Sequence, residues 1–282
     1  MAKLPRAHHS WVLEEADSNR LKDLYPDLWA DPQESCITCQ FETKADRSKT
    51  FRWLDDERSE VLDWECDCTS QWILHRKLLH HGIGKAYQRL GWMDAAYVPQ
   101  EAQDATWEYL ADSAWNVEHG VNLILHSPNA GTGKTLMLML LAKGMIREGR
   151  DVYVAQMNTI VEMYTSGWRS ADDRAHFERR IMNCGVLGID DLGKEMGQNR
   201  VDFIDRLVDR VIRHRVAQSK PVVVTTNLTR AELDTGYNRY VASLLTESCE
   251  FVETSGRDFR PQARIRAKAE HDQHLTRPLV LR

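Results

Sequence analysis

From about residue 104 onward, short apolar runs alternate with stretches in which apolar residues recur every three or four positions. The runs predict buried strands, and the longer spacing predicts helices. The expected strands are Val121–His126, Asp151–Ala155, Gly185–Asp190, Pro221–Thr226 and Glu250–Glu253. The expected helices are Thr106–Trp115, Lys134–Arg147, segments between Thr159 and Met182, Val201–Ala217 and Tyr240–Leu245. Strands separated by helices favour an α/β fold, with a parallel sheet covered by helices on both faces.

The first hundred residues have a weaker pattern. Residues 69–95 are expected to form one or two helices, and Tyr97–Ala102, which contains Pro99, is expected to be a linker. We therefore predict four parts: a small N-terminal domain over residues 1–95, a linker over 96–103, the main domain over 104–260 and a flexible basic tail over 261–282.

The composition is that of a soluble globular protein, with 42% hydrophobic and 28% charged residues among 282. The apolar run Leu136–Ala142 is far too short for a membrane span, and the N-terminus lacks the apolar core of a signal peptide. We expect a cytoplasmic protein without a membrane partner. Residues 1–114 contain 13 Lys+Arg and 21 Asp+Glu, a balance of −8, whereas residues 115–282 contain 24 and 21, a balance of +3. This asymmetry indicates different partners for the two parts, although chance variation in a solvated surface would look the same.

A glycine-rich segment, Ser127–Thr135 (SPNAGTGKT), joins the first expected strand to a helix. Glycines leave backbone N–H groups free to surround phosphate, and the following helix N-terminus adds its positive dipole end. Pro128 stands where the pattern G-x-x-x-x-G-K-[ST] has its first glycine. A turn without a ligand is the alternative, but it would not explain the closing Lys-Thr pair. The predicted ATP/ADP-binding residues are Asn129, Ala130, Gly131, Thr132, Gly133, Lys134 and Thr135. Lys134 would reach the β- and γ-phosphates, and the Thr135 hydroxyl would bind Mg²⁺.

Two polar strand ends are expected beside this loop, because strand C-termini gather at one edge of a parallel sheet. Asp190 would help to hold Mg²⁺, and Asp191 would orient or deprotonate the attacking water. Asn227 would bridge the γ-phosphate and that water. Local turns are the alternative for each of these residues, since Asp and Asn also start turns.

Four cysteines lie in the polar N-terminal part. Cys36 and Cys39 form a C-x₂-C pair, and Cys66 and Cys68 form a C-x-C pair 26 residues later. Four thiolates suit tetrahedral Zn²⁺, and a metal would stabilise a region too polar to build much core. Buried free cysteines are the alternative. Cys184 and Cys249 adjoin expected strands and are assigned to the core.

These motifs together resemble the helicase-loader branch of AAA+ ATPases, the DnaC, DnaI and IstB-like proteins, including loaders encoded by phages. The resemblance covers about residues 36–260. It rests on the four cysteines and on the segments SPNAGTGKT, GVLGIDDLG, VVVTTNL and SGRDFR.

The resemblance implies a five-stranded AAA+ sheet, with Asn227 as a sensor and a zinc-bearing N-terminal domain that contacts a hexameric replicative helicase. It also implies that the protein oligomerises on the helicase and touches single-stranded DNA between Thr159 and Met182. The candidates for that contact are Trp168, Arg169, Arg179 and Arg180. The compartment would be the bacterial cytoplasm, or that of the host if a phage encodes the protein.

One position departs from the family. Loaders carry two arginines four residues apart before the last strand, and the second acts on the ATP site of a neighbouring subunit. Here Arg239 matches the first, but Ser243 stands at the second. Either another arginine, Arg239 or Arg260, takes that role, or hydrolysis is weak. We therefore predict an ATP-dependent loader of a ring helicase. The alternatives are an IstB-like transposition helper on duplex DNA and a nucleotide-binding adaptor with little hydrolysis.

Overall fold

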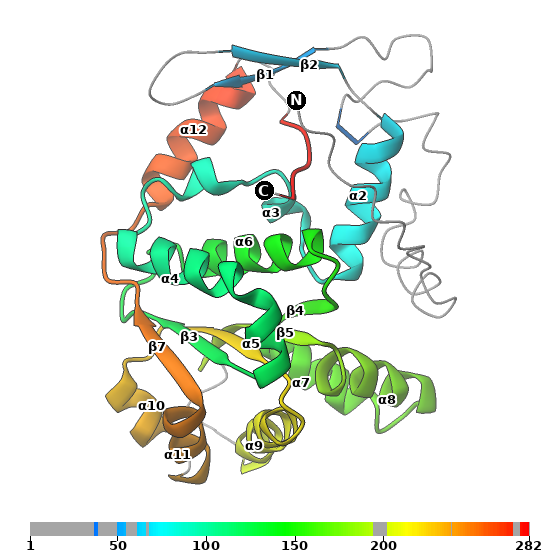
Figure 1. The fold of residues 1–282 in the computed structure, drawn as a ribbon, viewed down its shortest axis with the longest axis vertical. Coiled ribbons are helices and arrows are strands. Elements are labelled where there is room, and N and C mark those ends of the chain that lie inside the picture. Colours follow the sequence, from blue (N-terminus) through cyan, green and yellow to red (C-terminus); the bar gives the residue numbers. More distant parts are fainter. Residues whose placement is uncertain are drawn as a thin grey trace. The chain divides into compact units, whose positions relative to one another are not determined.

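The computed structural model describes residues 37–38, 50–54, 61–65, 68–193, 202–237, 239–272 and 277–281. The chain divides into two compact units (Figure 1). The first consists of Met1–Leu90 and Gln262–Leu281, and the second of Gly91–Pro261. Among the described residues, no helix is long and apolar enough to cross a membrane.

Among its described residues, the first unit contains a two-stranded antiparallel sheet and three helices. These elements are β1 (Thr50–Leu54), β2 (Val61–Glu65), α2 (Cys68–His80), α3 (Lys85–Gln88) and most of α12 (Arg260–Asp272). Inside this unit, the side-chain amide of Gln88 donates to the backbone carbonyl of Ile83 at 2.8 Å. The backbone carbonyl of Gln88 accepts the backbone N–H of Val280 at 3.1 Å. His75 also contacts the Gln88 side chain. The chain before α12 and the chain after it are therefore joined within one unit.

The second unit is built on a five-stranded parallel sheet, as predicted. Its strands are β3 (Asn122–His126), β4 (Val152–Gln156), β5 (Val186–Leu192), β6 (Val222–Thr226) and β7 (Cys249–Glu253). Their order across the sheet is β4-β5-β6-β3-β7, and all pairs are parallel. Strand β6 therefore lies between β3, which precedes the glycine-rich loop, and β5, which ends in the two aspartates.

Helices cover both faces of this sheet (Figure 1). In chain order they are η3 (Trp92–Ala95), α4 (Gln100–Ala111), α5 (Ser113–His119), α6 (Lys134–Arg147), α7 (Met157–Ser166), α8 (Ala171–Phe177), the π-helical turn η4 (Glu178–Met182), α9 (Asp202–Ala217), α10 (Arg230–Gly236) and α11 (Arg239–Ser248). Helix α6 packs so closely on β5 that a Cβ on Gly188 would lie 3.0 Å from Leu138. On the other face, residues of α7, α9 and α11 form one buried cluster with Ile124 and Val224.

Four parts of the structure differ from the sequence-based expectations. Helix α4 begins at Gln100, inside the segment expected to be a linker. The boundary between the units falls at Leu90–Gly91 rather than after residue 95. The region expected to be a flexible tail contains helix α12. Helix α10 was not expected, although Thr229 and Glu232 form the reciprocal capping bonds that mark a helix start.

Arg215, in α9, is completely buried in the second unit. Its guanidinium donates to five backbone carbonyls. The acceptors are Ile181, Met182, Cys184, Gly185 and Pro221, at 2.9–3.2 Å. Burial lowers the pKa of this guanidinium from its usual value, but arginine stays charged in proteins. The cation thus satisfies the carbonyls of the two segments that lead into β5 and β6.

Candidate nucleotide-binding site

The glycine-rich loop leaves β3 and runs directly into α6. Gly131 and Gly133 have φ angles of +78° and +94°, a backbone conformation that side chains rarely adopt. Lys134 is the first residue of α6, so the loop ends at a helix N-terminus. A helix start with free N–H groups and a positive dipole end suits a bound phosphate. Pro128 does not disturb this arrangement.

The Lys134 ammonium group lies within the loop. It donates to the carbonyl of Asn129 at 2.9 Å, to the carbonyl of Ser127 at 3.4 Å and to the hydroxyl of Thr132 at 3.3 Å. These three acceptors are neutral, and a phosphate oxygen would be a stronger acceptor for the ammonium group than any of them.

The other loop residues have structural partners. The backbone N–H of Asn129 donates to the hydroxyl oxygen of Ser127 at 3.2 Å, which closes a local turn. Thr132 is buried, and its hydroxyl lies 3.3 Å from that of Thr254. Ala130 is exposed at the tip of the loop.

Thr135 and Asp190 meet across the sheet edge. The Thr135 hydroxyl donates to Oδ1 of Asp190 at 2.8 Å, and the Thr225 hydroxyl donates to the same oxygen at 2.7 Å. Oγ1 of Thr225 in turn accepts the backbone N–H of Asp191 at 2.9 Å. A hydroxyl and a buried carboxylate at a phosphate loop are oxygen ligands of the kind that Mg²⁺ prefers. The donor set therefore fits Mg²⁺-ATP.

Thr225 was missed by the sequence analysis. Its place in the network follows from the strand order, because β6 lies between the strands that carry the loop and Asp190. The sequence places Thr225 near a strand end but does not give the neighbours of that strand. The available signal was a pair of threonines ending an otherwise apolar run.

Asp191 has a φ angle of +61°, which is unusual for a residue other than glycine. The pairing of β5 with β6 is irregular between Ile189 and Leu192, so the chain turns at Asp191. Such local strain is concentrated at functional sites. Asn227 directly follows β6 and is partly exposed, at the same end of the sheet. The structure thus brings Asp190, Asp191 and Asn227 to the edge that carries the phosphate loop.

Helix α11 carries the residues considered for action on a neighbouring subunit. Arg239 is exposed at its start and donates to the hydroxyl of Tyr240 at 2.8 Å. Ser243 is exposed one turn later, and its hydroxyl donates to Glu247 at 2.9 Å. The structure therefore leaves Arg239 at the surface.

The predicted zinc ligands Cys36, Cys39 and Cys66 lie outside the described residues, and Cys68 is the first residue of α2. In the described part of the chain, no group of three or more His, Cys, Asp or Glu side chains could hold a metal ion. The zinc site stays a prediction. Cys184 is buried and burial raises its thiol pKa to about 11, in agreement with a core role.

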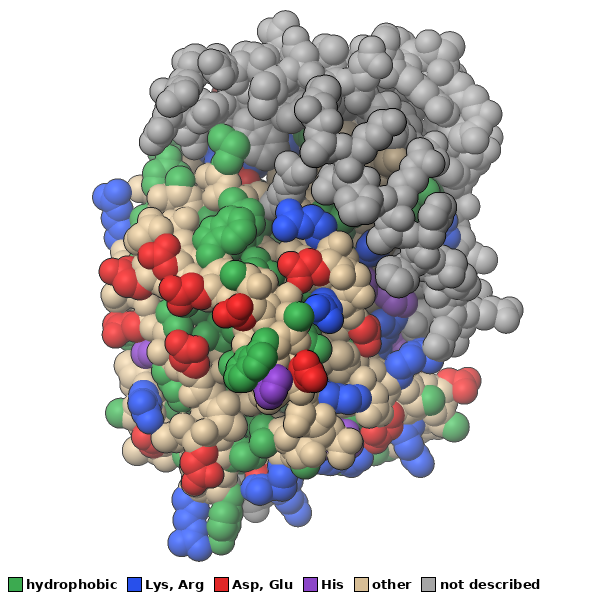
Figure 2. Space-filling view, viewed as in Figure 1, with side chains coloured by type: hydrophobic (Ala, Val, Ile, Leu, Met, Phe, Trp, Pro, Cys, Tyr) green, Lys and Arg blue, Asp and Glu red, His purple; other side chains and the backbone are tan. Residues whose placement is uncertain are grey.

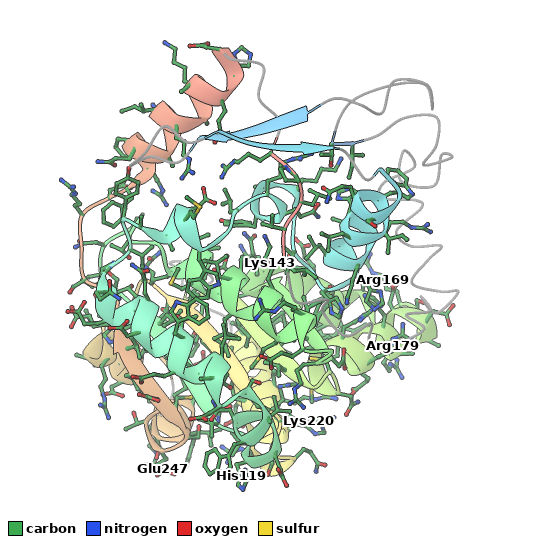
Figure 3. The ribbon with its side chains drawn as sticks, turned by 45° about the horizontal axis from the view of Figure 1, so that its top comes forward. His119, Lys143, Arg169, Arg179, Lys220 and Glu247 are labelled. Carbon is green, nitrogen blue, oxygen red and sulfur yellow. The ribbon has the colours of Figure 1, made fainter. Side chains whose placement is uncertain are left out.

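An aromatic cluster lies at the ends of α7 and α9. Trp168 is 62% exposed, and its ring lies 5.8 Å from Tyr164 and 5.5 Å from Phe203. Figure 3 shows Arg169 and Arg179 at this α7–α8 end of the unit. Arg180 is different from these two, because it is only 5% exposed and lies over the ring of Tyr153. The expectation that Arg180 is a surface contact is therefore corrected.

Exposed aromatic side chains also lie on α4 and α5, on a face where Figure 2 shows hydrophobic side chains among acidic ones. Trp107 and Trp115 are 48% and 55% exposed, and residues 100–119 contain no Lys or Arg. The same stretch contains five acidic residues, Glu101, Asp104, Glu108, Asp112 and Glu118, all exposed. This acidic face is unsuited to nucleic acid, whose phosphates it would repel.

Comparison with known proteins agrees with the geometry. The chain matches the profile of the family described as IstB-like ATP binding protein over residues 92–267. A solved structure of the DnaC helicase loader is 21% identical, with 61% of this chain and 100% of that chain covered and a TM-score of 0.50. Domain III of the Thermotoga maritima replication initiation protein DnaA is 14% identical, covering 69% of this chain and 78% of that chain, with a TM-score of 0.51.

A DNA replication initiation factor is 16% identical over 64% of this chain, with a TM-score of 0.50, and the match spans 54% of that chain, about half its length. At such identities these structures show the fold alone. No curated protein matches the chain. The family profile, in contrast, covers more than half of the chain and includes the phosphate loop, Asp190 and Asn227. The chain therefore belongs to the IstB-like ATP-binding proteins, within the DnaC/IstB-like AAA+ ATPases.

Proposed function

We propose that this protein is an ATP-dependent loader that binds a replicative ring helicase and places it on single-stranded DNA. The observation that carries the nucleotide part is the Thr135–Asp190–Thr225 network beside the phosphate loop. Nothing in the packing of the fold requires three polar side chains to converge at this edge, whereas a metal-bound nucleotide does.

The residues of this chain divide the work at the nucleotide. Lys134 and the loop N–H groups bind and orient the phosphates. Thr135 and Asp190 would hold Mg²⁺, which would neutralise negative charge on the phosphates. Asp191 accepts a proton from the attacking water, and Asn227 orients that water. The side chain of Asp191 is shorter than that of Glu and places its carboxylate farther from the attacking water, so we expect slow hydrolysis.

A neighbouring subunit completes the site in this proposal. Arg239 is exposed at the start of α11 and free to approach the nucleotide of another copy. The position one turn later, Ser243, supplies no positive charge. We therefore propose that the protein oligomerises on the helicase and that ATP binding matters more than rapid turnover.

Single-stranded DNA would contact the aromatic cluster of Tyr164, Trp168 and Phe203. Bases stack on exposed aromatic side chains, and arginines hold the backbone, which together give binding without sequence preference. Exposed Arg169 on the same end of the unit supplies such a charge. Trp168→Ala should weaken binding of a fluorescent oligothymidine about tenfold, since stacking contributes about 1–3 kcal/mol per base. Trp115→Ala, on the acidic face, is the matched control.

The helicase would be contacted by the N-terminal part, which carries the acidic balance of −8 (13 Lys+Arg against 21 Asp+Glu in residues 1–114) and the cysteine motif. The exposed acidic residues of α4 are included in this balance, whereas most of α5 follows residue 114. Complementary charge guides partner choice, so the helicase surface is expected to be basic. One Zn²⁺ per chain is predicted for the four cysteines, and elemental analysis checks it.

The second candidate is the transposition helper on duplex DNA, which the resemblance to IstB-like proteins implies. The discriminating experiment mixes the purified protein, ATP and the replicative ring helicase of the encoding organism, and follows complex formation by size-exclusion chromatography. Helicase binding, with transfer of the helicase to single-stranded DNA, supports the loader. Tight duplex binding without helicase binding would favour the transposition helper. Helicase binding without detectable ATP turnover, unchanged by Lys134→Ala, would indicate an adaptor.

A further inference from the structure

The segment that follows β7, Thr254–Phe259, lies directly against the phosphate loop, and we call it the strap. Its first residue donates through its backbone N–H to the carbonyl of His126 at 2.8 Å. The side-chain amide of Asn129 donates to the carbonyl of Gly256 at 3.3 Å. Near the other end, the N–H of Phe259 donates to the carbonyl of Gly131 at 3.0 Å. The strap is thus hydrogen-bonded to the end of β3 at His126 and to the phosphate loop at Asn129 and Gly131.

The strap places the carboxylate of Asp258 on the loop. A Cβ added to Gly131 would lie 1.9 Å from Oδ1 of Asp258 and 2.5 Å from its Cγ. The carboxylate therefore fills the space in which a side chain at position 131 would begin. The same Oδ1 accepts the backbone N–H of Arg260 at 2.9 Å, so its position is fixed. The loop carries a negative charge at this glycine although its own sequence is neutral there.

This charge opposes what the rest of the loop provides. The N–H groups, the N-terminus of α6 and the ammonium group of Lys134 all favour negative charge in the ligand. A carboxylate beside Gly131 would instead repel phosphates bound along the same loop backbone. Asp258 is exposed, so the repulsion is screened by water and salt rather than amplified by burial.

We propose that Asp258 sets the nucleotide affinity of this site, keeping ATP and ADP binding weak and exchange fast. A protein that needs ATP binding as a signal gains from rapid replacement of ADP, because its state then follows the ATP concentration. The proposal rests on the nucleotide site described above, and its test is designed so that the two can fail separately.

The test replaces Asp258 with Ser, which removes the charge and keeps an oxygen acceptor for the N–H of Arg260. Asp258→Asn is the near-isosteric second variant. Fluorescent ATP and ADP analogues give the Kd by titration and the dissociation rate by stopped flow. At low ionic strength both variants should bind about three- to tenfold more tightly, mainly through slower dissociation. The gain should shrink as salt is raised. Thermal melting without nucleotide checks that the variants fold.

Two controls separate the outcomes. Glu250→Gln removes one charge at the opposite end of β7 and should leave the affinity unchanged. Lys134→Ala should weaken nucleotide binding by about 100-fold or more. Unchanged or weaker binding by both Asp258 variants would overturn the role of Asp258 while leaving the nucleotide site intact. Equal binding by Lys134→Ala and the unmodified protein would instead refute the site itself.

Discussion

The phosphate loop and helix α11 differ in how much of their function this chain can supply alone. Around the loop, Thr135, Asp190 and Thr225 are joined by hydrogen bonds of 2.7–2.8 Å. On α11, Arg239 bonds to the hydroxyl of its own neighbour, Tyr240, and lies 4.8 Å from that ring. The network beside the loop is formed within one chain, whereas in our proposal Arg239 acts on the nucleotide of another copy.

The largest expected effect is on the loop side. Lys134→Ala should raise the Kd for ATP by about 100-fold or more, because the only side-chain cation in the loop is removed. Titration with a fluorescent ATP analogue measures it. Lys220→Ala removes a positive charge next to β6 and should leave the Kd unchanged. If Lys134→Ala kept its affinity for ATP, the assignment of nucleotide binding to the phosphate loop would be wrong.

Thr225 gives a sharper test of the same side. Thr225→Val has nearly the same shape but loses the bond to Asp190 and leaves the N–H of Asp191 without its acceptor. Turnover should fall about tenfold, and the free energy of unfolding should fall by about 1–3 kcal/mol. Steady-state ATPase assays and urea unfolding measure these changes. Thr225→Ser keeps the hydroxyl and should retain most of the ATPase activity. If Thr225→Val and Thr225→Ser were equally active, the hydrogen bonds of Thr225 would have no role in hydrolysis.

Arg239→Ala addresses the α11 side. The isolated protein should keep its Kd for ATP within about twofold, while turnover of the assembly on the helicase should fall about tenfold or more. Mixing this variant with Lys134→Ala should restore part of the turnover, because some sites then combine an intact loop with an intact arginine. A loss of binding in the isolated variant would contradict the assignment. Ser243→Arg should raise assembly turnover if position 243 can also reach the nucleotide.

The smallest effect concerns pH. Burial, aided by Lys134 and Arg230 and opposed by Glu253, lowers the pKa of His126 below its ordinary value of 6.5. The unfolded chain then binds more protons than the folded protein just below pH 6.5, so stability decreases as the pH falls through 6.5. The decrease ends below the lowered, folded-state pKa. His126→Phe should reduce this pH dependence of the melting temperature.

The decrease should not vanish in that variant, because burial also lowers the pKa of His75 in the first unit. Melting curves between pH 5 and pH 8 check both statements. A pH profile that His126→Phe leaves unchanged would show that protonation beside the loop does not affect folding stability.

The sequence predicted most of the second unit because β3, β5 and β6 are almost fully buried. Runs such as VVVTT are apolar on both faces, and each is bounded by a helix with clear spacing, so α6 (Lys134–Arg147) was predicted to the residue. The polar ends of β5 and β6 could be assigned to one edge because parallel strands share that edge.

What the sequence did not show depends on contacts between distant segments. The role of Thr225 requires that β6 lie between β3 and β5, which is a property of the sheet order. The role of Asp258 requires the strap to return to a loop more than 120 residues earlier in the chain. Helix α12 has no buried residues, so its sequence lacks the apolar face from which a helix is predicted.

The five carbonyls around Arg215 have a consequence for how this fold opens. They belong to the segments that precede β5 and β6, and one guanidinium donates hydrogen bonds to both segments. Neither segment can detach without leaving a buried cation with fewer acceptors, so the two should loosen together. In hydrogen exchange, the amides at the starts of β5 and β6 would then share a single opening rate, and that rate would report on a part of the molecule remote from the nucleotide.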